Sequence, residues 1–253
     1  MPVVIITGSS SGIGRETAIH FARHGWQVML TGRNEKNLSE AVSECLRAGA
    51  KVTDIAHVVG DINSLSVAKL LVETTVDKFG TINCLVNNAG IVTMGTFAES
   101  KLDQYETMFN TNVWSVIQLT QLALPHLIAS GGTVVNVSSI ASLAWQPGYG
   151  FYSMTKSALD AFTKTLAVEV AAQGVRVNSV NPGNINTPIF DSIGMTDEQK
   201  AQTFEYAKKA HALGRMGTVD EVAKAIFWLA GPDSSFTTGE LLKVDGGFVL
   251  VRP

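Results

Sequence analysis

A tyrosine and a lysine stand four residues apart in the segment YSMTK, where the sequence becomes helical. This spacing corresponds to one helical turn, so the side chains of Tyr152 and Lys156 are expected on the same face of the helix. A free tyrosine has a pKa of roughly 10, and a neighbouring ammonium group stabilises its anion. The spacing therefore suits a tyrosine that exchanges a proton with a substrate. By itself the pair is a common pattern that an ordinary surface helix also explains.

Length and composition narrow the class of protein. The chain has 253 residues and 45% hydrophobic content, so we expect a single domain over 1–253 with one large core. A net charge of -3 and a pI near 5.9 provide no basic excess for nucleic acid or an anionic membrane. No signal peptide or long apolar run is seen, which predicts a soluble, cytoplasmic protein. Cys45 and Cys84 are isolated, so neither a metal site nor a disulfide is predicted.

A glycine-rich turn follows the first predicted strand. The run VVIIT at 3–7 is typical of a strand buried on both faces of a parallel sheet. Gly8, Gly12 and Gly14 in TGSSSGIG then lead into a segment with helical periodicity. Glycines let backbone N–H groups and a helix N-terminus approach a pyrophosphate. Strand, turn and helix together therefore favour a dinucleotide site over an ordinary tight turn.

The end of the second predicted strand, 27–31, bears on which dinucleotide binds. An acidic residue at this place holds the adenosine ribose 2′-hydroxyl of NAD, whereas this chain has Gly32 and then Arg33. A guanidinium group can donate two hydrogen bonds to a 2′-phosphate, so the sequence favours NADP over NAD. The alternative is a solvated loop arginine. Asn34 is included in the predicted cofactor site.

Small and polar residues follow the other predicted strands, at the edge where parallel α/β sheets bind ligands. Asp61, after the strand at 55–59, is placed to accept from adenine or to cap the next helix. The residues NNAG at 87–90, after the strand at 82–86, would let a flat cofactor lie against backbone or would form a simple turn. Ser139 follows the strand at 133–137, and the strand at 175–180 ends in NPG.

The most apolar helix is predicted over 112–127. Its apolar residues occur almost all round, so we expect one face against the sheet and another against a second subunit of a homo-oligomer, a dimer or tetramer. Asn112 is a polar side chain in this apolar setting. It either satisfies neighbouring backbone groups, or it holds a water or distorts the helix near the active site.

Residues 188–216 interrupt the alternation of strands and helices. Thr196 and Gln199 have the spacing of a capping box for a helix through Lys209. We expect this helical insertion to cover the cofactor and to line an apolar substrate cleft, although its apolar residues would equally pack against the body. The cleft residues are Ile189, Phe190, Ile193, Met195, Phe204 and Tyr206. Six or seven strands alternating with helices predict an α/β fold, a Rossmann-type doubly wound parallel sheet.

Together these residues resemble the short-chain dehydrogenase/reductase family, from Thr7 to about Gly247. The resemblance rests on motifs in this order: TGSSSGIG, NNAG, a serine thirteen residues before Tyr152, YSMTK, and NPGNINT at 181–187. It implies an NADP(H)-dependent carbonyl reductase or alcohol dehydrogenase acting on a small, fairly apolar substrate.

The resemblance also implies a role for each matching residue. Tyr152 would be the general acid in carbonyl reduction and the base in the reverse reaction. Lys156 would lower the pKa of Tyr152 and bind the nicotinamide ribose. Ser139 would donate to the carbonyl oxygen, and Asn112 would hold a water that links Lys156 to a proton relay.

The cofactor contacts implied by the resemblance cover most of the strand ends. They are Gly8, Ser10, Ile13 and Gly14 for phosphates and adenosine, Asp61 and Ile62 for adenine, Asn88, Ala89 and Gly90 along the ribose, and Gly183, Ile185 and Thr187 for the carboxamide. The predicted cofactor site also includes Gly12, Arg33, Asn34, Tyr152, Lys156 and Pro182. NADP-preferring members often carry a basic residue inside the glycine motif, where this chain has only serines at 9–11, so NADP rests mainly on Arg33.

Two alternatives remain open from the sequence. The first is an NAD-dependent dehydrogenase of the same fold. The second is a non-catalytic, dinucleotide-binding regulatory protein, although such proteins usually lose the tyrosine, lysine or serine that are all present here.

Overall fold

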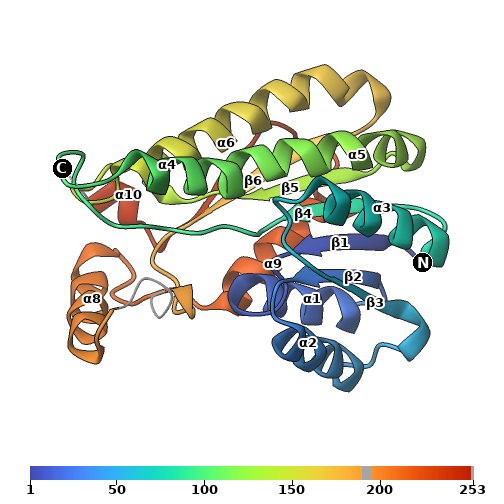
Figure 1. Ribbon diagram of the computed structural model, residues 1–253, viewed down its shortest axis with the longest axis horizontal. Coiled ribbons are helices and arrows are strands. Elements are labelled where there is room, and N and C mark those ends of the chain that lie inside the picture. The colour runs from blue at the N-terminus through green and yellow to red at the C-terminus, as the bar shows by residue number, and fades with distance from the viewer. Residues whose placement is uncertain (190–194, 252–253) are drawn as a thin grey trace.

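A parallel β-sheet runs through the centre of the molecule (Figure 1). The structure is a computed structural model that describes residues 1–189 and 195–251. The strand order β3-β2-β1-β4-β5-β6-β7, with every neighbouring pair parallel, confirms the predicted doubly wound Rossmann-type sheet. The strands are β1 (Val3–Thr7), β2 (Gln27–Gly32), β3 (Ile55–Val59), β4 (Cys84–Asn87), β5 (Thr133–Val137), β6 (Arg176–Pro182) and β7 (Leu241–Val244).

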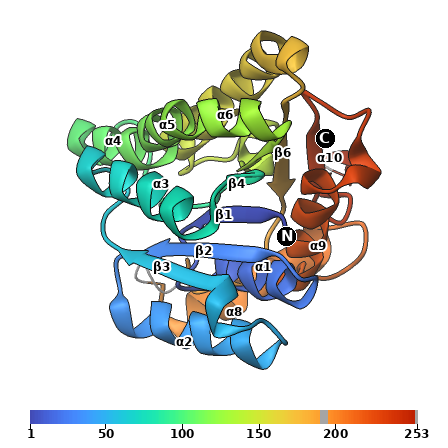
Figure 2. The ribbon, with the colours of Figure 1, turned by 90° about the vertical axis from the view of Figure 1, so that its right-hand side faces the viewer.

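Helices cover both faces of this sheet (Figures 1 and 2). One layer contains α1 (Gly12–Arg23), α2 (Glu35–Arg47) and α9 (Val219–Ala230). The other contains α3 (Leu65–Phe79), α4 (Leu102–Phe109), α5 (Ser115–Ser130) and α6 (Gly150–Val170). Each described helix is too short or too polar to span a lipid bilayer.

The first strand shows why its sequence is continuously apolar. Val4 and Ile6 are fully buried in the cluster that includes residues of α1, α2 and α9. Ile5 points to the opposite face and is fully buried in the cluster with residues of α3, α5 and α6. Because successive side chains of a strand alternate between faces, a strand covered by helices on both sides needs apolar residues at every position.

The helix predicted over 112–127 is part of a longer and irregular helical segment. It comprises α4, a π-helical turn over Asn110–Trp114, and then α5. The sequence analysis did not foresee α4, and it placed the start of the apolar helix inside the π-helical turn. A π turn contains an extra residue and rotates the following side chains, so it interrupts the helical periodicity.

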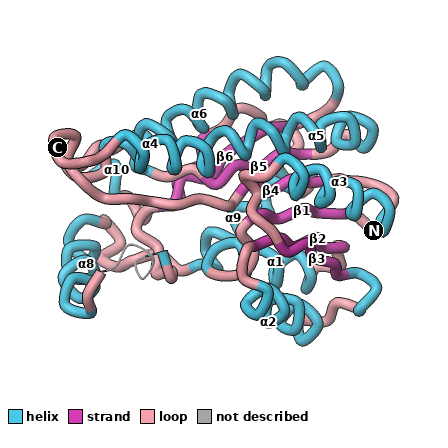
Figure 3. The backbone as a smooth tube through the Cα atoms, in the orientation of Figure 1, coloured by secondary structure: helices cyan, strands magenta, loops and turns pink. Residues whose placement is uncertain are grey.

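The predicted insertion contains α8 (Asp197–Ala210), which stands apart from the α1, α2 and α9 layer in Figure 1. The capping box is confirmed, because Thr196 Oγ1 accepts from the Gln199 N–H at 3.2 Å and Gln199 Oε1 accepts from the Thr196 N–H at 2.9 Å. Figure 3 shows long loops leaving the sheet on the side where α8 lies. Phe190 and Ile193 lie outside the described residues.

Candidate active site

A cavity of about 990 Å³ opens at the carboxyl ends of the strands, as expected for this sheet. Its walls come from the loops after β1 to β6 and from α8. Three predicted site residues, Gly14, Asn34 and Asn112, do not line it. The predicted residues that do are Gly8, Ser10, Gly12, Ile13, Arg33, Asp61, Ile62, Asn88, Ala89, Gly90, Ser139, Tyr152, Lys156, Pro182, Gly183, Ile185 and Thr187.

Gly14 is needed for packing and not for lining the cavity. A Cβ at this position would overlap the Gly8 carbonyl oxygen and the Asn88 amide nitrogen. Helix α1 therefore approaches the end of β1 more closely than a side chain would allow. Gly8 and Gly12 have φ of 64° and 56°, a left-handed conformation that favours glycine.

Asn88 joins two of the predicted cofactor segments. Its Nδ2 donates to the carbonyl oxygens of Thr7 at 2.8 Å and of Gly8 at 3.2 Å. Thr7 Oγ1 in turn accepts from the backbone N–H groups of Asn88 and Ala89, each at 2.9 Å. The turn after β4 is thereby held against the glycine turn after β1, which gives the cavity a rigid wall.

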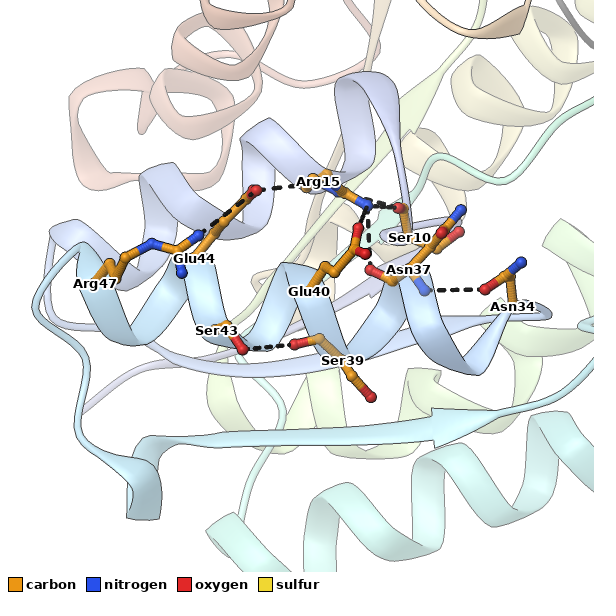
Figure 4. Close-up of polar contacts among 9 residues, drawn as sticks. All are labelled: Ser10, Arg15, Asn34, Asn37, Ser39, Glu40, Ser43, Glu44 and Arg47. Carbon is orange, nitrogen blue, oxygen red and sulfur yellow. Dashed lines mark hydrogen bonds and ion pairs between the residues drawn. The ribbon is translucent and has the colours of Figure 1, made fainter.

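Arg15 fastens the glycine turn to α2 (Figure 4), a role that the sequence analysis missed. Its Nε and Nη2 donate to the Ser10 carbonyl oxygen at 3.0 and 2.6 Å, and Nη2 also donates to Asn37 O at 3.2 Å. Carboxylate oxygens of Glu40 and Glu44 lie 3.6 Å from the guanidinium. The available signal was a basic residue directly after GIG in the motif.

The segment after β2 brings Ser10 beside the predicted phosphate-binding arginine. A Cβ on Gly32 would lie 3.0 Å from both the Cβ and Oγ of Ser10, so Gly32 allows this serine to pack close to the chain. Arg33 is exposed and lines the cavity. Asn34 instead caps α2, since its Oδ1 accepts from the Asn37 N–H at 2.9 Å (Figure 4).

Asp61 shapes a turn at the cavity wall. Its Oδ1 accepts from the Asn63 N–H at 3.0 Å, and its carbonyl oxygen accepts from the Ser64 N–H at 2.9 Å. The turn leads directly into α3, for which Ser64 is the N-cap residue without a side-chain capping bond. The side chain thus organises the entry to this helix while the residue lines the cavity.

Asn112 satisfies backbone groups next to the site. Its Oδ1 accepts from the Ile91 N–H at 2.8 Å, and its Nδ2 donates to Ile91 O at 2.9 Å and to Thr155 Oγ1 at 3.0 Å. It lies in the π-helical turn, in line with the predicted distortion of this helix. Asn112 and Lys156 converge behind Gly90, where an added Cβ would lie 3.3 Å from Asn112 Oδ1 and 3.5 Å from Lys156 Nζ.

Tyr152 and Lys156 lie one turn apart on α6 and both line the cavity. Lys156 Nζ is 5.6 Å from the centroid of the Tyr152 ring. The same nitrogen donates to the carbonyl oxygen of Val137, at the end of β5, at 2.9 Å. Helix α6 is therefore positioned so that the buried ammonium group is anchored at the carboxyl end of a central strand.

The pKa values of this pair are shifted mainly by burial. Desolvation raises the pKa of Tyr152 to about 12, although a hydrogen bond with the Ser139 side chain acts in the opposite direction. Burial lowers the pKa of Lys156 to about 8, against the effect of the Asp160 carboxylate. The sequence analysis expected Lys156 to lower the pKa of Tyr152. The net shift of the Tyr152 pKa is nevertheless upward, because the loss of water disfavours the phenolate.

Ser139 is presented by a turn that follows β5. It is the N-cap of a 3-10 turn over Ile140–Ser142, and its Oγ accepts from the Ala141 N–H at 3.1 Å. The Ser139 carbonyl oxygen accepts from Ser142 Oγ at 2.7 Å. These bonds hold the hydroxyl at the cavity wall, where it lies within hydrogen-bonding reach of Tyr152.

Both apolar and polar side chains line the end of the cavity near α8. Of the predicted cleft residues that the structure describes, Ile189, Met195 and Tyr206 line the cavity, while Phe204 does not. Helix α8 contributes Gln199, Gln202, Thr203 and Tyr206 to the cavity wall. The side chains that were not foreseen are Met94, Gln146, Tyr149, Gln199, Gln202 and Thr203.

A buried histidine links α8 to the predicted carboxamide-binding segment, and the sequence analysis missed it. His211 Nδ1 lies 2.7 Å from Ala207 O, and Nε2 lies 3.3 Å from the Asn184 N–H nitrogen. A carbonyl oxygen only accepts, so Nδ1 carries the proton and Nε2 accepts from Asn184. A Cβ on Gly183 would lie 2.9 Å from Nε2, so the glycine permits this approach.

Comparisons with known proteins agree with this fold. A family model described as enoyl-(acyl carrier protein) reductase matches residues 8–249. The 3-oxoacyl-(acyl-carrier-protein) reductase of Thermotoga maritima is 36% identical over 98% of this chain and 98% of that protein. Dehydrogenase/reductase SDR family member 4 of Caenorhabditis elegans is 35% identical over 97% of this chain and 94% of that protein. A Caenorhabditis elegans short-chain dehydrogenase/reductase of unknown function, crystallised with cofactor, has a TM-score of 0.94 at 36% identity, covering 99% of this chain and 96% of that one.

Proposed function

This chain belongs to the short-chain dehydrogenase/reductase family, and we propose that it is an NADP(H)-dependent oxidoreductase that interconverts a carbonyl compound and a secondary alcohol. The observation that supports this activity is the meeting of Tyr152, Lys156 and Ser139 in one cavity with the glycine turn after β1. A proton donor and a dinucleotide cradle in the same cavity are what such a reaction requires.

The cavity residues fit a nicotinamide dinucleotide. The left-handed glycines Gly8 and Gly12 leave backbone N–H groups accessible beside the N-terminus of α1, which suits a pyrophosphate. Asp61 and Ile62 would hold the adenine, and the segment 88–90 would lie along a ribose. Residues 182–187 together with Tyr152 and Lys156 would hold the nicotinamide end. When bound, the nicotinamide supplies or accepts the hydride.

The preference for NADP rests on Arg33. Its guanidinium is exposed at the adenosine end of the cavity, next to the close contact of Gly32 with Ser10. A fork of N–H donors suits a 2′-phosphate. Arg15 is a weaker candidate for this role, because two carboxylates and two carbonyl oxygens already surround its guanidinium.

Tyr152 is suited to donate a proton during reduction. With a pKa of about 12 its phenol stays protonated near neutral pH. Negative charge that develops on the substrate oxygen would be met by the Tyr152 and Ser139 hydroxyl groups, and the Lys156 ammonium stabilises the phenolate left after transfer. Oxidation of an alcohol needs the phenolate first, so this direction gains rate as the pH rises.

The polar lining of the substrate end suggests a carbonyl compound that also carries hydrogen-bonding groups. Three glutamines and two tyrosines, Gln146, Gln199, Gln202, Tyr149 and Tyr206, line this part of the cavity. The proposed substrate is therefore the small, fairly apolar compound expected from the sequence, with hydrogen-bonding groups that these side chains could contact. The names of the family model and of one relative refer to acyl carrier protein, so 3-oxoacyl thioesters belong in the substrate panel.

A substrate screen tests the proposal directly. Purified protein is mixed with NADPH or NADH at equal, subsaturating concentration and with a panel of ketones, diketones, quinones, sugars and 3-oxoacyl thioesters, while the absorbance of the reduced cofactor is followed. We expect reduction of at least one compound, faster with NADPH. Faster turnover with NADH would reject the cofactor preference alone, and no turnover with either would reject the proposed activity.

We also propose that the protein forms homo-oligomers in the cytoplasm. Leu102 on α4 and Trp114 in the π-helical turn are 71% and 59% exposed, which supports a further protein surface packing on this helical segment. Light scattering of the purified protein would show a single subunit if this proposal is wrong.

A further inference from the structure

Asp160 is a buried acid for which the proposed reaction has no direct use. It is 6% exposed and lies on α6 one turn beyond Lys156, so Tyr152, Lys156 and Asp160 form one stripe along the helix. It does not line the cavity. A carboxylate is costly to bury unless it is paired or hydrogen-bonded, so its partners indicate what it does.

The hydrogen-bond donor to Asp160 comes from the last part of β6. Asn181 Nδ2 lies 3.2 and 3.0 Å from the two carboxylate oxygens. The Asn181 Oδ1 accepts from Ser179 Oγ at 2.7 Å, which fixes the orientation of the amide. The Nδ2 hydrogens therefore face Asp160 and the turn that carries Ser139.

The same amide holds that turn. Asn181 Nδ2 lies 3.2 Å from the Ser139 carbonyl oxygen and 3.1 Å from Ser142 Oγ. Asn181 is fully buried, so these contacts are shielded from bulk solvent. Asp160, through Asn181, is thus connected to the backbone that presents the Ser139 hydroxyl to the cavity.

Asp160 is also the anion that accompanies the buried Lys156. On α6 the titratable groups next to Lys156 are Tyr152 and Asp160. The groups from other elements that lie near its ammonium group carry no charge: Val137 O accepts from it, and Gly90 and the Asn112 amide lie beside it. Within residues 1–189 and 195–251, Asp160 is therefore the negative charge that offsets the burial of this ammonium group.

We propose that Asp160 is a positioning residue with two effects. Its charge keeps Lys156 protonated inside the protein, and its contact with Asn181 keeps the Ser139 turn in place. The consequence for turnover rests on the proposed function, whereas the coupling between Asp160 and Lys156 does not.

A double-mutant cycle tests the coupling without cofactor or substrate. The unfolding midpoints in urea are measured at pH 7 for the wild type, Asp160→Asn, Lys156→Met and the double variant. We expect Asp160→Asn to lower the urea midpoint by more when Lys156 is present than in the Lys156→Met background. An equal shift in the two backgrounds would overturn the proposal.

The pH dependence of carbonyl reduction tests the effect on the site. Asparagine at position 160 keeps an oxygen that accepts from Asn181, so Asp160→Asn removes the charge and retains the link to the Ser139 turn. We expect the alkaline limb of kcat/KM to move to lower pH by roughly one unit, because the ammonium loses its counter-charge. If Asp160 had only a structural role, Asp160→Asn would lower kcat/KM without moving the alkaline limb of its pH profile.

Two further variants keep the result decisive. Ser153→Ala alters a buried side chain on the same helix, whose Oγ has no hydrogen-bond partner among the described residues, and it should leave the pH profile unchanged. If Asp160→Asn does not fold, Asp160→Ser should show the same shift of the limb. An unmoved limb in a folded charge-removing variant would reject the proposal. If the wild type reduces no carbonyl compound, the proposed function fails, and the double-mutant cycle still decides the role of Asp160.

Discussion

Lys156 Nζ lies 5.6 Å from the centroid of the Tyr152 ring, one turn further along α6. Burial moves the two pKa values apart, that of Tyr152 up to about 12 and that of Lys156 down to about 8. Near neutral pH both groups are therefore protonated, a hydroxyl beside an ammonium. This is the arrangement that a proton donor to a carbonyl oxygen needs.

Replacing Tyr152 with phenylalanine removes the proposed proton donor and keeps the ring. We expect Tyr152→Phe to bind NADPH as the wild type does and to lose at least roughly a hundredfold in kcat, the usual scale for general acid catalysis. Steady-state kinetics and a fluorescence titration with NADPH measure the two properties. Turnover at the wild-type rate would show that another group delivers the proton.

The pH profile should differ between the two reaction directions. Lys156 has a pKa of about 8, so its positive charge is lost as the pH rises through that value. We expect kcat/KM for reduction to be flat from acid to neutral pH and to fall above about 8, whereas alcohol oxidation should rise with pH because it needs the Tyr152 phenolate. Initial rates in both directions across this range check the signs. A reduction rate that climbs above pH 8 would contradict the role of Lys156.

The buried ammonium group of Lys156 should cost stability. Its pKa is lower in the folded than in the unfolded state, so between pH 8 and 10.5 the unfolded chain binds more protons and the unfolding free energy rises with pH. The unfolding free energy of Lys156→Met should exceed that of the wild type by the largest amount below pH 8. This difference should shrink by up to about 3 kcal/mol as the pH rises to 10.5. Urea unfolding at several pH values measures the difference, and a constant difference would argue against a perturbed Lys156.

Gly14 should not tolerate a side chain, because a Cβ would meet the Gly8 carbonyl oxygen and Asn88 Nδ2. We expect Gly14→Ala to destabilise the protein by about 1–3 kcal/mol and to weaken NADPH binding, since the glycine turn must shift. Gly231→Ala is a matched control, because its Cβ would be 3.4 Å from the nearest atom, an ordinary contact. Equal melting temperatures for Gly14→Ala and Gly231→Ala would contradict the packing argument.

Arg33 should decide between the two nicotinamide cofactors. We expect Arg33→Ala to raise the KM for NADPH by about tenfold or more while the KM for NADH changes little, because the proposed contact of the lost group is with the 2′-phosphate alone. Arg47→Ala is the control. Arg47 is also an exposed arginine associated with α2, but it pairs with Glu44 at the other end of the helix (Figure 4). Equal losses for both cofactors would assign Arg33 a structural role.

The strand pattern was readable from the sequence because burial on both faces requires unbroken apolar runs. Val3–Thr7, Ile55–Val59 and Thr133–Val137 have the bounds predicted for them. Helix α4 was missed because the π-helical turn at Asn110–Trp114 breaks the periodicity on which a helix prediction depends.

For the site, local spacing was sufficient where the residues share one element. Tyr152 and Lys156 lie on one turn of α6, and the glycine turn follows β1 directly, so both were predictable. Tertiary structure decided the rest. Asn34 caps a helix, Asn112 satisfies the backbone of Ile91, and Asp160 reaches Asn181 across the core. Burial, which raises the pKa of Tyr152, is the sum of contacts from distant segments, and no local pattern of residues carries that information.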